Sequence, residues 1–156
     1  MKLLLVRHGE ASFKAITDAQ RPLTQLGSLE IEQQCLNPNI PWSEFTALWA
    51  SPYLRAQQTA HLLQQQLAKQ YAPLKVQTCD VSTPHGAIEQ VQNFLLKQNQ
   101  AGIILVTHQP LVSGLIGHFC HNNEAMGEPM MPASMALLEG EVAAAACMTL
   151  MQLEHP

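Results

Sequence analysis

Two histidines that lie far apart in the chain each follow a short apolar run. His8 ends the run LLLVRH, and His108 ends the run IILVTH. Arg7 directly precedes His8, and Arg55 lies in a third segment, SPYLRAQQT. Arginine pairs its planar N–H donors with phosphate oxygens and keeps its charge, and a neutral imidazole can act as a nucleophile. These residue types are therefore typical of a site that binds a tetrahedral phosphoryl dianion.

The apolar runs before the histidines predict strands that are buried on both faces of a sheet. Four strands are predicted in this part of the chain: residues 2–6, 46–51, 74–79 and 102–108. The carboxyl ends of parallel strands lie at one edge of a sheet, and open α/β sheets bind ligands at that edge. We therefore expect His8, Arg55 and His108 to converge there. Helix N-termini near Pro52 and Pro110 would add backbone N–H donors.

Helical patterns alternate with these strands. The predicted helices cover residues 24–36, a long segment that begins near Pro52 and extends to about residue 70, residues 85–98, and residues 110–119. Thr24 is the expected N-cap of the first helix, whose apolar positions are Leu26, Leu29 and Ile31. Two further strands are expected near residues 133–139 and 146–153. The alternation predicts an α/β fold with three layers, α/β/α, around a mainly parallel central sheet, and we expect residues 1–156 to form a single domain.

Composition narrows the classes of partner. Charged residues make up 13% of the chain, about half of the usual ~25%, and the net charge is −4. A broad basic face for nucleic acid is therefore not expected. No segment approaches the ~18 apolar residues of a membrane span, and Arg7 and His8 interrupt the apolar start before it could serve as a signal peptide. We expect a cytoplasmic protein with neither a nucleic-acid nor a membrane partner.

Four motifs occur in order along the chain: RHG at residues 7–9, RPLTQLG at 21–27, SPYLRAQQTA at 51–60 and VTHQP at 106–110. Together they resemble the histidine phosphatase superfamily, and most closely its SixA-type phosphohistidine phosphatases. The resemblance implies a phosphoglycerate-mutase-like fold. It extends from Leu3 to about Gly117, and residues 118–156 carry no motif that adds to it.

The resemblance also implies a mechanism. His8 is the expected nucleophile, which takes the phosphoryl group as an enzyme phosphohistidine that water then hydrolyses. Arg7 and Arg55 would bind the phosphoryl oxygens, and His108 would complete the cradle as a hydrogen-bond donor. The other ring nitrogen of His8 should donate to a backbone carbonyl, with Gly9 as the expected source, and the neighbouring arginines should disfavour the imidazolium form.

Three further features of the site are open at this stage. Arg21 is assigned to phosphate or substrate-side binding, and the alternative is a surface arginine ahead of a helix. Ser12 could lend a hydroxyl to the phosphate or have no role. Arginines supply the charge that a divalent cation supplies elsewhere, so no metal or cofactor is required, and the cluster around His118 and His121 lacks a fourth ligand.

One departure from the superfamily bears on the substrate. Many of its members place a glutamate acid after the third strand, but here that region reads CDVSTPHGAIEQV, with only Asp80 and Glu89 nearby. An alkoxide leaving group has a conjugate acid with a pKa near that of water, ~15.7, whereas an imidazole has ~6.5. The region therefore favours a phosphohistidine substrate, carried by a phosphotransfer domain or a phosphocarrier protein. His85 could donate a proton, or could simply be a partly exposed residue.

Two alternative functions remain at this stage. One is a small-molecule phosphomonoesterase of the same superfamily, which would use Glu89 or Asp80 as its acid. The other is a non-catalytic phosphate-binding module, in which His8 would never be phosphorylated.

Overall fold

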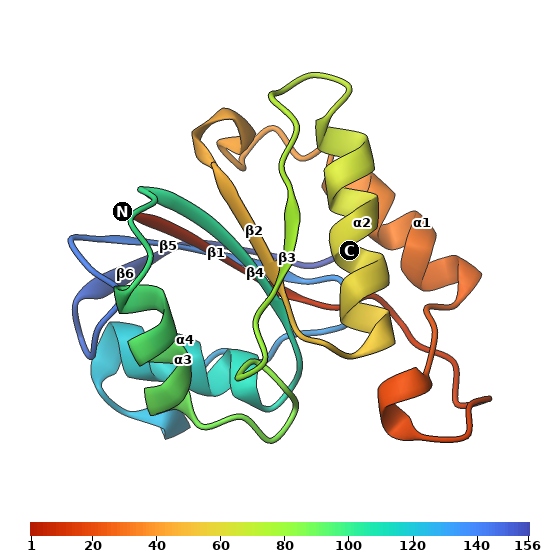
Figure 1. The fold of residues 1–156 in the computed structure, drawn as a ribbon. Coiled ribbons are helices and arrows are strands. Elements are labelled where there is room, and N and C mark those ends of the chain that lie inside the picture. The colour runs from red at the N-terminus through yellow and green to blue at the C-terminus, as the bar shows by residue number, and fades with distance from the viewer.

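Six strands form one sheet in the computed structural model, which describes all residues 1–156. The strands are β1 (Lys2–Arg7), β2 (Ala47–Ala50), β3 (Val76–Thr78), β4 (Gly102–Thr107), β5 (Met135–Gly140) and β6 (Met148–Glu154). Their order across the sheet is β3-β2-β4-β1-β5-β6 (Figure 1). The first four strands run parallel, while β5 is antiparallel to β1 and β6 is antiparallel to β5. The prediction of a mainly parallel sheet is confirmed, and so are both strands of the tail.

Helices cover both faces of this sheet (Figure 1). The four are α1 (Gln25–Gln34), α2 (Leu54–Leu67), α3 (Ile88–Leu96) and α4 (Leu111–His121). Leu4 and Val6 of β1 pack into the core that contains α1 and α2, whereas Leu3 and Leu5 pack into the core that contains α3 and α4. Successive strand side chains point to opposite faces, so the buried centre of β1, residues 3–6, must be apolar at every position. The three-layer prediction is confirmed.

The first helix begins as predicted but buries a different set of side chains. Thr24 is its N-cap and accepts a hydrogen bond from Gly27 N–H at 3.0 Å. Leu26 and Leu29 are 52% and 55% exposed, whereas Ile31 is fully buried. The inward face follows the spacing of Gly27, Ile31 and Gln34, which lie on one side of a 3.6-residue helix. The expectation for Leu26 and Leu29 as core-facing positions was therefore wrong.

The third helix is shorter than predicted. It starts at Ile88 rather than at residue 85, because Gly86 N–H bonds to Thr83 O at 2.9 Å and closes a turn. A Cβ on Gly86 would lie 2.1 Å from Val81 O, so only glycine fits this turn. His85 therefore lies in a loop rather than on a helix.

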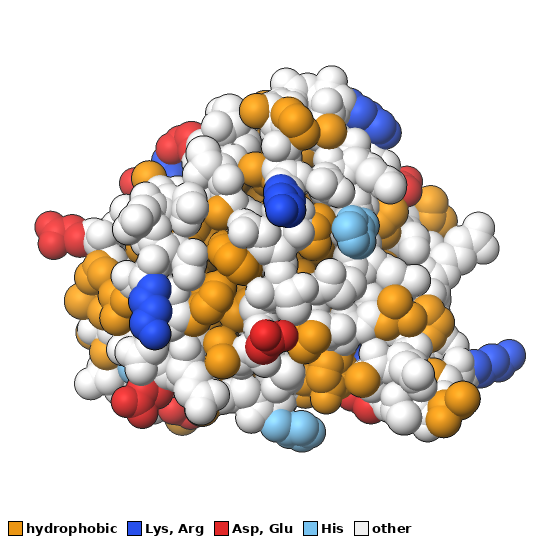
Figure 2. Space-filling view, viewed as in Figure 1, with side chains coloured by type: hydrophobic (Ala, Val, Ile, Leu, Met, Phe, Trp, Pro, Cys, Tyr) orange, Lys and Arg blue, Asp and Glu red, His pale blue; other side chains and the backbone are white.

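The molecular surface carries few charges. The face in Figure 2 shows mainly uncharged polar and apolar side chains, with charged groups standing apart from one another. None of the helices combines the length and apolar character needed to cross a membrane.

Candidate active site

The two histidines meet because their strands are neighbours. Arg7 of β1 pairs with Thr107 of β4, so the next residues in each strand, His8 and His108, leave the sheet side by side. Their ring centroids are 4.9 Å apart. Arg55, in the first turn of α2, reaches the same point and places its Nε 3.0 Å from His8 Nε2. The structure thus brings together the four residues that the sequence predicted.

These side chains line a pocket of about 290 Å³, which we call the histidine pocket. Its lining consists of Arg7, His8, Glu10, Ala11, Phe13, Arg21, Arg55, His108, Gln109 and Pro132. Three guanidinium groups and two imidazoles face this space. That density of N–H donors suits an oxyanion.

His8 is held in one tautomer. Its Nδ1 lies 2.7 Å from Gly9 O, and a carbonyl oxygen can only accept, so Nδ1 carries the ring hydrogen. Nε2 keeps its lone pair and accepts the Nε–H of Arg55. The predicted contact with the Gly9 carbonyl is confirmed. A Cβ on Gly9 would lie 2.6 Å from Gly27 O, so glycine allows this turn to pack against α1.

The electrostatic environment keeps His8 neutral. Burial is the main cause that lowers the pKa of His8 to about 4; the Gly9 carbonyl opposes this effect, and the charges of the neighbouring arginines add smaller contributions in the same direction as burial. The predicted direction is confirmed, but the main cause is burial rather than the arginines. At neutral pH the Nε2 lone pair is therefore available for attack on phosphorus.

His108 lines the histidine pocket and has one unpaired buried ring nitrogen. Ser51 Oγ accepts the Tyr53 N–H at 3.4 Å, so its own hydrogen can be donated to His108 Nε2 at 2.7 Å. The hydrogen of the neutral His108 ring is then on Nδ1, which is buried without a protein partner. Burial lowers the pKa of His108 well below its ordinary value, with a further contribution from His8. Ser51 is a residue that sequence reasoning missed.

Arg7 carries the second unpaired donor. One terminal nitrogen donates to Met130 O at 2.5 Å, while its Nε is buried without a partner. Native structures rarely leave a buried donor unpaired, so Arg7 Nε calls for a partner, and a bound ligand is one that the pocket could hold.

Arg21 lines the pocket and also fixes the loop beside it. Its Nε donates to Ser12 O at 2.9 Å and one terminal nitrogen donates to Ala11 O at 3.1 Å. The guanidinium carbon lies 4.0 Å from the centre of the Phe13 ring. The Ser12 hydroxyl, by contrast, accepts the Lys14 N–H at 3.1 Å, and Ser12 is not among the lining residues.

Two carboxylates near the pocket were not predicted. Glu10 lines it, and its Oε1 accepts the hydroxyl of Thr24 at 2.8 Å. Asp18 lies on the short 3-10 turn η1 (Asp18–Gln20) and contacts both Arg55 and Arg21. Glu10 follows the RHG motif directly, which was a usable signal, whereas no pattern in the sequence distinguishes Asp18 from an ordinary loop residue.

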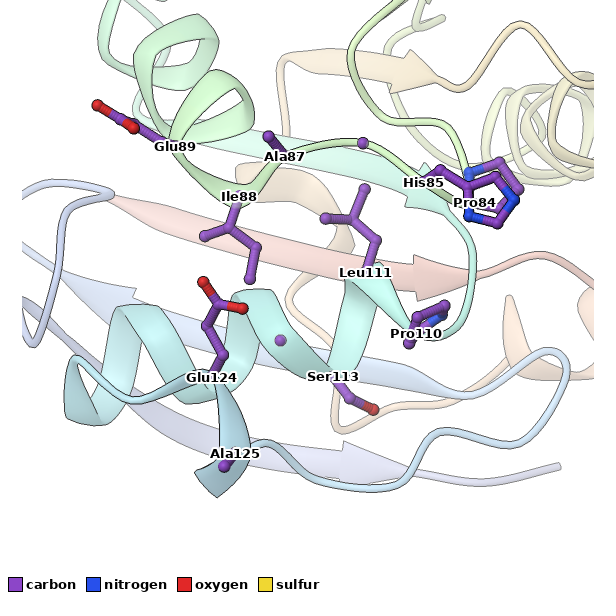
Figure 3. Close-up of a pocket in the computed structure, with 12 residues that line it drawn as sticks. Pro84, His85, Ala87, Ile88, Glu89, Pro110, Leu111, Ser113, Glu124 and Ala125 are labelled. Atoms are coloured by element: carbon purple, nitrogen blue, oxygen red, sulfur yellow. The ribbon is translucent and has the colours of Figure 1, made fainter.

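His85 and Glu89 line a different and larger hollow of about 830 Å³. In Figure 3, Ile88 and Leu111 project into this hollow, Glu124 borders it from the turn η3 (Glu124–Met126), and His85 lies at one end. Asp80, His85 and Glu89 are all absent from the lining of the histidine pocket. The structure does not bring these candidate acids to His8.

His118, at the end of α4, makes a polar contact with α3. His118 Nε2 lies 2.8 Å from Gln92 Oε1. Nowhere in the chain do three or more histidine, cysteine or acidic side chains gather closely enough to hold a metal ion.

Comparison with known proteins places this geometry in a family. The family model of the histidine phosphatase superfamily (branch 1) matches residues 3–79, a span that includes Arg7, His8 and Arg55. This match bears out the resemblance to the histidine phosphatase superfamily that the four motifs predicted. His108 lies outside the matched span, but the structure places it against His8.

Two relatives are described as a SixA phosphohistidine phosphatase and its homolog. The chain is 28% identical over 123 residues to the phosphohistidine phosphatase SixA of Escherichia coli (strain K12), covering 77% of this chain and 74% of the relative. It is also 28% identical over 146 residues to a SixA homolog of Haemophilus influenzae, covering 88% and 87%.

Solved structures with different names share the fold. The structure of the protein histidine phosphatase SixA complexed with tungstate has a TM-score of 0.85 at 24% identity, covering 98% of this chain and 96% of that one. A phosphoserine phosphatase from Entamoeba histolytica, in complex with 3-phosphoglyceric acid, has a TM-score of 0.65 at 18% identity, covering 99% and 97%. Proteins named for quite different phosphorylated substrates therefore share this histidine phosphatase fold.

Proposed function

We propose that the protein is a phosphohistidine phosphatase that removes the phosphoryl group from a histidine-phosphorylated protein. The observation that carries the proposal is the pair of unpaired buried nitrogens, Arg7 Nε and His108 Nδ1, on residues that line the same pocket as His8, whose Nε2 lone pair contacts only the Nε–H of Arg55. A phosphoryl group would satisfy both donors and meet the nucleophile at once.

The reaction runs in two displacements. His8 Nε2 attacks phosphorus, forming a P–N bond as the bond between phosphorus and the substrate imidazole breaks. The leaving nitrogen keeps the electron pair, and because the other ring nitrogen of the substrate carries a hydrogen, the imidazole leaves in its neutral form. Water then attacks phosphorus, and His8 Nε2 leaves as the neutral imidazole. Arg7, Arg55 and His108 hold the phosphoryl oxygens in both steps. Their positive charge and N–H donors supply the stabilisation that a divalent cation would supply, so the proposed reaction is independent of metal.

The leaving group favours a phosphoramidate. The histidine pocket contains one lining carboxylate, Glu10, and that carboxylate is already bonded to Thr24. Asp18 is bonded to two guanidinium groups, which hold the pKa of its carboxyl below the ordinary value against the opposing effect of burial. An ionised carboxylate is no proton donor, so expulsion of an alkoxide lacks a ready acid, whereas an imidazole leaves with little assistance.

The rim of the pocket supports a protein as substrate. Phe13 lines the pocket yet is 86% exposed, and Ile16 in the same loop is 95% exposed. An enclosed site would suit a small sugar phosphate better than this open one. The SixA relatives are named for phosphohistidine, so a phosphotransfer domain or phosphocarrier protein is the proposed partner.

A small-molecule phosphomonoesterase is the second candidate, and the position of Glu10 favours it. If Glu10 released Thr24, its carboxyl group could protonate an alkoxide. This alternative requires Glu10→Gln to abolish turnover of an aliphatic phosphate ester while leaving turnover of phosphohistidine unchanged.

The deciding experiment offers a phosphohistidine protein, p-nitrophenyl phosphate and a sugar phosphate side by side, in the presence of a chelator. Marked preference for the phosphohistidine protein is expected, with transient label on His8 that is labile to acid. His8→Ala should lose turnover but still bind orthophosphate or tungstate. Preference for the sugar phosphate would overturn the proposal, and near-normal activity of His8→Ala would rule out the covalent mechanism.

A further inference from the structure

Asp18 bridges the two guanidinium groups that border the histidine pocket. Its Oδ2 accepts from a terminal nitrogen of Arg55 at 3.1 Å, and its Oδ1 accepts from a terminal nitrogen of Arg21 at 3.1 Å. The backbone carbonyl of Asp18 accepts from the other terminal nitrogen of Arg55 at 2.6 Å. Asp18 thus binds the outer end of Arg55 with two separate oxygens.

The planar shape of arginine makes this contact directional. A guanidinium group has five N–H bonds in a fixed fork, so fixing two of them fixes the direction of the rest. With Asp18 on both terminal nitrogens, the Nε–H of Arg55 is directed at His8 Nε2, 3.0 Å away. The edge of Arg55 that contains Nε is therefore the edge presented to a phosphoryl group at His8.

The burial of Arg55 explains why it needs this partner. Its side chain is 5% exposed, whereas that of Asp18 is 54% exposed. A buried cation is costly unless it is paired and hydrogen-bonded. Asp18 is the carboxylate that pairs with Arg55, and it approaches from the outside, opposite to the edge that faces His8.

We propose that Asp18 is a positioning residue, which orients Arg55 so that its Nε edge meets the phosphoryl group on His8, and which ties Arg21 into the same network. The inference rests on the proposed phosphoryl-transfer function and adds a residue that acts through Arg55. Asp18 remains in place while the phosphoryl group is bound.

Asp18→Ala removes the carboxylate contacts with Arg55 and Arg21 but leaves other bonds that hold the two arginines. In Asp18→Ala the backbone carbonyl can still accept from Arg55, and Arg21 still holds the loop through the carbonyls of Ser12 and Ala11. A matched control is Glu44→Ala. Glu44 is a half-exposed carboxylate on a 3-10 turn, η2 (Trp42–Glu44). It pairs with Lys2, which lies at the start of β1, whereas the histidine pocket lies at the end of that strand.

The test measures kcat and KM separately for the phosphorylated substrate that the wild-type protein turns over. Asp18→Ala should lower kcat at least tenfold with less than a threefold change in KM, whereas Glu44→Ala should match the wild-type protein. Asp18→Asn keeps an acceptor oxygen and should recover most of kcat. In an Arg55→Ala background, Asp18→Ala should cause no further loss.

Two results would overturn the inference: a kcat within twofold of the wild-type value in Asp18→Ala, or equal losses with and without Arg55. Failure of the proposed function gives a different result: the wild-type protein would prefer a sugar phosphate, on which kcat and KM are then measured, or would turn over none of the phosphorylated substrates. In the latter case the same coupling is measured in orthophosphate binding by calorimetry. Independent effects of Asp18→Ala and Arg55→Ala on the affinity would refute the inference there too.

Discussion

Replacement of His8 by glutamine should make the protein less sensitive to acid, although it removes the nucleophile. The pKa of His8 is lowered to about 4 in the folded protein, mainly by burial, from an ordinary value of 6.5. The unfolded chain therefore binds this proton more readily than the folded chain, and stability falls as the pH drops from 6.5 toward 4. Glutamine cannot titrate, so His8→Gln lacks this loss.

The magnitude follows from proton linkage. Each state contributes a factor 1 + 10^(pKa − pH), and the factor of the unfolded chain is divided by that of the folded protein. This ratio is close to one at pH 7 and about 80 at pH 4.5, so the free energy of unfolding falls by about 2 kcal/mol over this interval. The pH-independent effects of the substitution, such as the lost bonds to Gly9 and Arg55, cancel when each protein is compared with itself. His108 titrates in both proteins and cancels to first order.

The assay is urea unfolding of both proteins at pH 7 and at pH 4.5, with NMR titration of the His8 ring as an independent measure of its pKa. The wild-type protein should lose about 2 kcal/mol more than His8→Gln over this interval, and the ring should titrate near pH 4. Equal losses in the two proteins, or a titration midpoint near the ordinary value, would refute the argument that burial holds His8 neutral.

Other substitutions test the remaining contacts of the site. Arg55→Ala should weaken orthophosphate binding at least tenfold by calorimetry, because each charge-assisted bond is worth ~1.5–3 kcal/mol; unchanged affinity would place Arg55 outside the cradle. Gly9→Ala puts a Cβ 2.6 Å from Gly27 O and should destabilise the fold by about 1–3 kcal/mol in urea, and an unchanged midpoint would contradict the packing. Ser51→Ala should reduce kcat several-fold by freeing the His108 ring, and Ser51→Thr should restore it; equal activity of both variants would argue against this orienting bond.

The sequence predicted the centre of the site better than its border. His8 and His108 directly follow buried parallel strands, so sheet topology alone brings them together at one edge. Arg55 lies in the first turn of α2, and the sequence predicted a helix that begins near Pro52. Glu10 and Asp18 reach the site through the loop that follows β1. The path of this loop depends on contacts of Arg21 with the backbone carbonyls of Ser12 and Ala11, which local patterns do not specify.

The errors in the prediction of the fold have a similar origin. Leu26 and Leu29 are apolar but exposed, because close packing of Gly27 against Glu10 turns a different face of α1 inward; a Cβ on Gly27 would lie 2.4 Å from Glu10 O. His85 lies in a loop because the turn at Gly86 precedes the helix, which begins only at Ile88. In each case a glycine packed against backbone decided the outcome, and hydrophobic periodicity does not register such contacts.

Burial links the chemistry of this site to its specificity. The same desolvation that keeps His8 neutral leaves Arg7 Nε and His108 Nδ1 without solvent or protein partners. Unpaired buried donors cost ~1–3 kcal/mol each, and a bound phosphoryl group recovers that cost. The carboxylates at the border, Glu10 and Asp18, are meanwhile engaged in other bonds, so the site provides strong oxyanion stabilisation but little general-acid assistance. Such a site favours substrates whose leaving group departs readily, and the imidazole of a phosphohistidine has that property.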